Sequence, residues 1–224
     1  MNPVSRVINA FAAPQATFQA EQEKSLWYVP FVLFLVLTIA GTLIMRPLTQ
    51  KIQEEKIVET MEKQGLPQEQ IDEALERTKN MGAVMTIVPA VLIQTATFFV
   101  TAAIWLFVAN VILAGNARYV QMLSVTAYSW LVVAVGMLIK APIMTAKESI
   151  NVHFSPAVIL SNEDSFIYKL LAQFDLFNIW CFFLVTIGIA VMTGKKAQQV
   201  WPWTALFFLI YFLGAAAMQS AFGF

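Results

Sequence analysis

Five long intervals of this sequence are apolar and almost free of charge, and they constrain the fold more than any other feature. A helix needs about 20 mostly apolar residues to cross roughly 30 Å of hydrocarbon. The intervals long enough to cross are about 27–45, 84–112, 119–141, 168–193 and 200–222. Because hydrocarbon offers no partner for backbone N–H and C=O groups, continuous runs of this length indicate helices instead of barrel strands. The sequence predicts an all-α integral membrane protein with five transmembrane helices over residues 27–224.

The charged residues support this class and limit the partners. They make up 12% of the chain, against roughly 25% in an ordinary soluble domain. The 14 basic and 14 acidic residues cancel and cluster between the apolar intervals. No basic face results, so we expect the lipid bilayer as a partner and no nucleic acid. A single cysteine, Cys181, excludes an intrachain disulfide.

The segment 1–26, before the first span, is amphipathic. The apolar residues that share one helical face are Val4, Val7, Ile8 and Phe11. Pro14 suits the start of a second short helix that carries Phe18. We expect this segment to lie in the headgroup layer, and a frayed polar terminus is the alternative. Because residues 1–24 are mixed and polar, we expect the first span to be retained and not removed as a secretory signal.

The charged segment 46–80 separates the first two spans. Gly65 suits a helix end and Pro67 a helix start, so the segment is predicted to form a helical hairpin. Pro47 argues against one unbroken helix from the first span into it, and Pro142 against continuation of the third span. The apolar residues predicted to dock a partner are Ile57, Met61, Ile71 and Leu75. The alternative is a solvated connector whose apolar stripe is buried within the hairpin.

Asp175 is an ionisable residue inside the fourth predicted span, which makes it the main candidate for a functional site. The residues of this candidate polar site are Asp175, Asn178, Tyr128, Ser129 and Lys140. In the functional interpretation, Asp175 and Asn178 bind an ion, a headgroup or a proton within the bundle. In the structural interpretation, Asp175 pairs with Lys140 or bonds to the hydroxyl of Tyr128 or Ser129 and holds helices together.

Recognisable catalytic and cofactor motifs do not occur in the sequence. His153 has no second histidine or cysteine cluster near it, so we expect no metal, no cofactor and no enzyme activity. Polar residues in the second span leave a transporter or channel for a small solute, ion or lipid as the alternative, using spans 2 and 4. These residues are Gln94, Thr95, Thr97, Thr101 and Asn110.

The sequence from residue 119 onward resembles a known family in its order of features. The third span begins with residues 119–129, YVQMLSVTAYS, and a loop with the sequence NVHFSP follows at 151–156. The fourth predicted span contains an Asp-x-Phe-x-Ile-Trp element at 175–180 and later Gly188. These features resemble the Yip domain family, the Ypt-interacting proteins, in its bacterial branch.

The resemblance implies a five-span helical membrane protein with a cytoplasmic N-terminus, in the bacterial cytoplasmic (inner) membrane. Eukaryotic relatives bind Rab-type GTPases and act in vesicle traffic. We therefore expect a non-enzymatic membrane scaffold that binds partner proteins, or itself as a homo-oligomer. The hairpin over 46–80 departs from compact family members.

Overall fold

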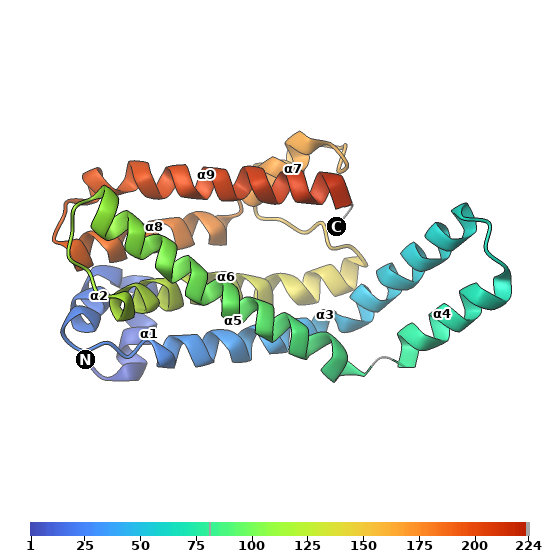
Figure 1. Ribbon diagram of the computed structural model, residues 1–224, viewed down its shortest axis with the longest axis horizontal. Helices are drawn as coiled ribbons and strands as arrows, with labels where there is room; N and C mark the ends of the chain where they lie inside the picture. The colour runs from blue at the N-terminus through green and yellow to red at the C-terminus, as the bar shows by residue number, and fades with distance from the viewer. Residues whose placement is uncertain (81, 223–224) are drawn as a thin grey trace.

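The computed structural model describes residues 1–80 and 82–222, and over these residues it is helical without a strand (Figure 1). Five of the described helices are long and apolar enough to cross a membrane. They cover Tyr28–Lys63, Ile87–Ile112, Tyr119–Lys147, Leu176–Thr193 and Ala197–Ala221. The predicted all-α membrane fold is therefore confirmed. The helix over Tyr119–Lys147, α6, is the most buried of the five and forms the centre of the bundle.

Two short helices, α1 (Pro3–Ala12) and α2 (Pro14–Glu23), pack against one end of the bundle. The side chain of Asn2 caps α1 by accepting from the Ser5 amide at 2.7 Å. Phe18 is fully buried, in edge-on contact with the Tyr128 ring. The exposed side of α1 carries Val4 and Ile8, which are 68% and 62% accessible. The N-terminal segment is thus docked on the bundle by one face, and its position in a headgroup layer stays a prediction.

Helix α3 (Tyr28–Lys63) runs without a break through the first span and onward for 36 residues, about 54 Å. The predicted break at Pro47 is therefore wrong. Proline inside a helix removes one backbone hydrogen bond and costs about 3 kcal/mol. Met45 and Leu48, on either side of it, are buried in a cluster with residues of α6, and this packing offsets the cost.

Pro142 likewise lies inside α6 (Tyr119–Lys147) and does not end it. Ala141 and Met144 next to it supply the α6 half of the same cluster, so the packing that keeps α3 helical also keeps α6 helical. The helix ends where Glu148 adopts a left-handed conformation with φ 50°.

The hairpin between the first two spans consists of the last turns of α3 and α4 (Gln68–Asn80). Gly65 adopts φ +68°, which favours glycine, and the Leu66 amide donates to the Met61 carbonyl at 3.1 Å. This closure ends α3 and turns the chain into α4, so the predicted helical hairpin is confirmed. Figure 1 shows it projecting from the end of the bundle opposite α1 and α2.

The second span is α5 (Ala83–Phe107), which ends in a π-helical turn, Val108–Ile112. The side-chain amide of Asn110 closes the following loop on Ala117, accepting from its amide at 2.7 Å and donating to its carbonyl at 2.9 Å. A 3-10 turn, Pro156–Ile159, lies in the loop after α6.

The fourth predicted span, 168–193, is divided in two. Helix α7 (Phe166–Gln173) ends before Asp175, and α8 (Leu176–Thr193) begins after it. Only the 18 residues of α8 form the span, so the predicted placement of Asp175 inside a transmembrane helix is wrong. An aspartate favours this boundary because its carboxylate can bond to the free N–H groups of a helix start. The last helix is α9 (Ala197–Phe222).

Two glycines allow neighbouring helices to approach α6 and α8 closely. A Cβ atom at Gly136 would lie 2.3 Å from the Phe177 ring, and one at Gly188 would lie 2.8 Å from Val125 and 3.2 Å from Phe18. The separations of 2.3 Å and 2.8 Å are too short for non-bonded carbon atoms, and the separation of 3.2 Å is unusually tight. These glycines therefore position α8 against α6, and Gly188 also makes room for the ring through which α2 packs.

Candidate functional site

Asp175 lies at the start of α8, where it joins three separate parts of the chain. One carboxylate oxygen accepts from the Phe177 amide at 3.1 Å, and the other accepts from the Phe154 amide at 2.9 Å. The Lys140 Nζ lies 3.3 Å from the second oxygen. Asp175 is 2% exposed. The carboxylate therefore links α6, the loop after it and α8.

The other predicted members of this site are dispersed. Asn178 donates to the Gln173 carbonyl at 2.9 Å, which bridges the break between α7 and α8. Tyr128 bonds to Glu21 and not to Asp175, and the buried Ser129 hydroxyl has no hydrogen-bond partner in the described chain. The predicted ion pair between Asp175 and Lys140 is thus present. The alternative bonds from Asp175 to Tyr128 or Ser129 are not formed, since Tyr128 bonds to Glu21 and Ser129 has no partner among the described residues. A functional role for the site stays a prediction.

His153 lies in the loop beside this site. Its ring contacts the Tyr168 ring edge-on, with centroids 5.9 Å apart. Burial lowers the pKa of His153 below its usual 6.5, and the positive charge of Lys140 lowers it further. The imidazole is therefore neutral at neutral pH. The described residues contain no group of three side chains suited to hold a metal ion.

A second polar site, at the opposite end of the bundle, joins α1, α2 and α6. Arg6 Nη1 lies 2.6 Å from Glu21 Oε1, and Arg6 is 5% exposed while Glu21 is fully buried. The same Arg6 nitrogen donates to the Lys24 carbonyl at 2.6 Å. Glu21 also accepts from Tyr128 at 3.1 Å and from Ser124 at 2.7 Å. A buried ion pair thus bonds the N-terminal helices to the central helix.

Sequence reasoning did not find this second site, because it placed residues 1–26 on the membrane surface. A signal was nevertheless present: Ser124 and Tyr128 are spaced i, i+4 on an apolar span and so share one helical face. Two hydroxyls on one face indicate a polar partner, but no rule of spacing says that the partner is Glu21, more than 100 residues away.

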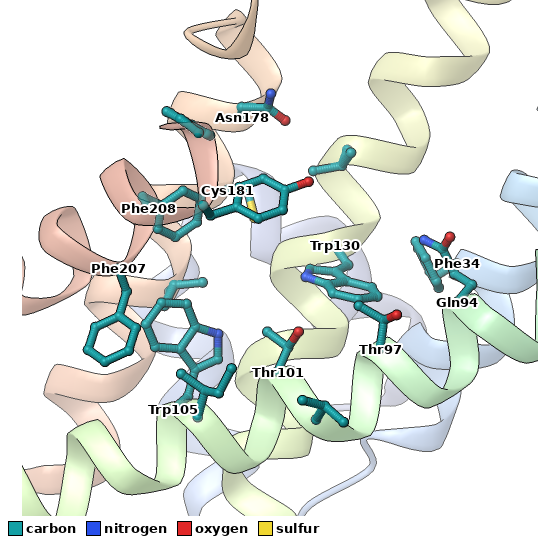
Figure 2. A pocket seen from close by; sticks show the side chains of 16 residues that line it. Phe34, Gln94, Thr97, Thr101, Trp105, Trp130, Asn178, Cys181, Phe207 and Phe208 are labelled. Carbon is teal, nitrogen blue, oxygen red and sulfur yellow. The ribbon is translucent and has the colours of Figure 1, made fainter. Parts of the chain in front are cut away.

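A cavity of about 470 Å³ lies between α5 and α9, with α6 and α8 behind it (Figure 2). We call it the α5–α9 groove. Its lining residues are Phe34, Gln94, Thr97, Val100, Thr101, Ile104, Trp105, Trp130, Val133, Asn178, Cys181, Val185, Phe207, Phe208, Tyr211 and Phe212. Three of the polar residues of the second span therefore meet Asn178 here, and Asp175 does not line the groove.

The four predicted docking residues of the hairpin lie mainly between its helices. Ile71 is 2% exposed, and Ile57, Met61 and Leu75 are half-buried. The outward faces carry charged residues, and four of these form two ion pairs, each within one helix: Lys63 with Glu59 on α3 and Arg77 with Glu73 on α4, each at 2.6 Å. The apolar stripe thus contributes to closing the hairpin itself.

The fold and these sites define a multi-pass helical membrane protein, with polar residues that bond helices to one another at both ends of the bundle. The Yip1 domain family model matches residues 8–218, which is nearly the whole chain, so the protein belongs to the Yip1 domain family. It is similar to the membrane protein YknW of Bacillus subtilis (strain 168), with 22% identity over 197 residues, 87% of this chain and 81% of that protein. No solved structure matches the chain.

Proposed function

We propose that the protein is a non-enzymatic membrane scaffold that presents its charged hairpin to a partner protein outside the bilayer. The observation that supports this most is the continuity of α3. At about 54 Å, this helix exceeds the roughly 30 Å of the hydrocarbon by some 24 Å. The excess holds the hairpin at a defined position beyond the lipid instead of on a flexible linker.

The root of the hairpin is attached to the bundle. Ile52 packs against the cluster that joins α3 to α6, and Lys51 forms an ion pair with Glu148 just after α6. A rigid root favours binding because less conformational entropy is lost when a partner docks. A partner would meet the charged outer faces, because the apolar residues lie between the two helices.

Charge outside the hairpin supports a cytoplasmic N-terminus in a bacterial inner membrane. The N-terminal end of the bundle carries five basic residues, Arg6, Lys24, Arg118, Lys195 and Lys196, and two acidic residues, Glu21 and Glu23. The opposite end carries three basic residues, Lys140, Lys147 and Lys169, and four acidic residues, Glu148, Glu163, Asp164 and Asp175. Basic residues favour the cytoplasmic side, particularly in short loops. In this proposed orientation, the hairpin lies on the side of the membrane opposite the cytoplasm.

The proposal can be tested by charge reversal on the outer face of the hairpin. Glu69→Lys reverses the charge of an exposed residue of α4, and Asp164→Lys makes the same change of charge in an exposed loop at the same end of the bundle. Proteins captured by the full chain in mild detergent, after cross-linking in cells, are compared by mass spectrometry. We expect Glu69→Lys to lose specific partners that Asp164→Lys retains. Identical partner sets, or capture of no partner by the native chain, would refute hairpin docking.

A further inference from the structure

The α5–α9 groove opens between two helices that are poorly covered by protein. Figure 1 shows α5 and α9 close together at one end and diverging toward the other. Only 22% of the most apolar window of each helix is buried. Because both helices are membrane spans, the mouth of the groove faces the acyl chains of the bilayer. Its volume of about 470 Å³ falls in the ~300–1,000 Å³ range of ligand pockets.

The lining of the groove restricts the chemistry of an occupant. Aromatic and aliphatic side chains predominate, and the polar members are the uncharged Gln94, Thr97, Thr101, Asn178 and Tyr211. An ionised headgroup would find no counter-charge among the lining residues, and burying it would be unfavourable. The inserted part of an occupant is therefore neutral and mostly hydrocarbon.

Trp105 adds a specific requirement for a hydrogen-bond acceptor. Its side chain is held by a stacked contact with Phe208 and an edge contact with Phe207, with centroids 5.9 Å and 6.0 Å apart. The residue is 5% exposed, yet its Nε1 has no hydrogen-bond partner in the described chain. Figure 2 shows the indole nitrogen on the edge of the ring that faces Thr101, which lies one turn earlier on the same helix, α5. Buried tryptophan N–H groups usually have an acceptor, so this donor needs one.

The depth of Trp105 suits an ester group. It precedes Ile112, the end of the span, by seven residues, which is about 10 Å along a helix. The headgroup region on each side of the hydrocarbon is about 5–7 Å thick. With the 26-residue span, about 39 Å long, taken to cross the hydrocarbon and both headgroup regions, the indole lies just inside the hydrocarbon boundary, next to the depth at which the ester carbonyls join acyl chains to glycerol.

We propose that the α5–α9 groove binds one acyl chain of a membrane phospholipid, and that the ester carbonyl of this chain accepts a hydrogen bond from Trp105 Nε1. A helix of a second copy fits less well, because its backbone carbonyls already accept bonds within the helix. A lipid ester carbonyl has no such partner in hydrocarbon. The proposal concerns occupancy of the groove and is independent of partner docking at the hairpin.

The test uses a phosphatidylcholine with a photoreactive diazirine in one acyl chain, added to the purified full-length chain in mild detergent. Unlabelled phosphatidylcholine with ester-linked or ether-linked chains of equal length competes for the site, since only the ester has a carbonyl. One net hydrogen bond corresponds to about a fivefold difference in affinity. We expect the ester lipid to compete about fivefold better on the native chain, with labelled peptides mapping to α5 and α9.

Two variants isolate the Trp105 contribution. Trp105→Phe keeps a ring against Phe208 but removes the N–H, so we expect the ester and ether lipids to compete equally. Trp203→Phe makes the same change at an exposed tryptophan of α9 outside the groove and should keep the fivefold difference. Equal competition on the native chain, labelling outside the groove, or cross-linking of a second copy within it would each overturn the proposal. The comparison on the native chain needs no variant to fold.

Discussion

Replacing Glu21 with glutamine should strongly destabilise the N-terminal end of the bundle. One Glu21 oxygen accepts from Arg6 and Tyr128, and the other accepts from the Leu26 amide and Ser124. A glutamine NH₂ in either position would face an N–H donor, from Arg6 or from Leu26. The Arg6 charge would also stay buried without its partner.

The expected loss follows from this geometry. Breaking a buried ion pair by removing one partner costs about 3–5 kcal/mol. For a chain of this size, 1 kcal/mol shifts the melting temperature by about 2–4 °C, so we expect a decrease of roughly 6–20 °C. Cys181 makes the measurement simple: it is the single cysteine and is 4% exposed, so a thiol-reactive fluorophore reports unfolding around α8 during heating in detergent.

Two comparisons separate the ion pair from general effects of substitution. Glu23→Gln removes a charge from an exposed position of the same helix and should leave the melting temperature nearly unchanged. Arg6→Met combined with Glu21→Met removes both buried charges and should recover much of the loss. Limited proteolysis between α1 and α2 shows whether the N-terminal helices detach first. A Glu21→Gln protein that has the same melting temperature as the Glu23→Gln protein, and is no more sensitive to protease, would refute the reasoning.

Three further predictions concern α6, α8 and the loop between α6 and α7. Asp175→Ala removes the cap of α8 and the partner of the partly buried Lys140, and should cost about 3–5 kcal/mol in detergent unfolding; an unchanged melting temperature would exclude a structural role. Gly136→Ala forces the Phe177 ring to move and should cost about 1–3 kcal/mol, whereas Gly214→Ala, with nothing near its added Cβ, should cost nothing; equal melting temperatures would contradict the close approach. Because the folded pKa of His153 is lowered, the unfolded chain binds the proton first, so stability falls as pH drops below about 6.5. His153→Gln should therefore lose less stability than the native chain between pH 7.5 and pH 5.5, and an equal loss would refute the assignment.

The membrane class was predictable from the sequence because hydropathy acts locally. Each charge-free interval needs no knowledge of its neighbours to be favoured in hydrocarbon, and its backbone must bond internally. The turn at Gly65 and Pro67 was predictable for the same reason, since conformational preferences act within a few residues. The proline rule failed at Pro47 and Pro142, where contacts between α3 and α6 outweigh a local preference.

In the polar sites, too, the sequence indicated some residues, whereas their contacts depend on the tertiary structure. Asp175 stood out in the sequence as a charge among apolar residues, but its role as a helix cap and its bond to the Phe154 amide depend on the path of the loop after α6. The bond between Glu21 and Tyr128 joins residues 107 positions apart. The sequence alone determined that five segments prefer lipid to water, because that preference is a sum over adjacent side chains. Only the tertiary structure decided which charges are buried together and where α5 and α9 leave a groove, because those outcomes depend on packing between distant segments.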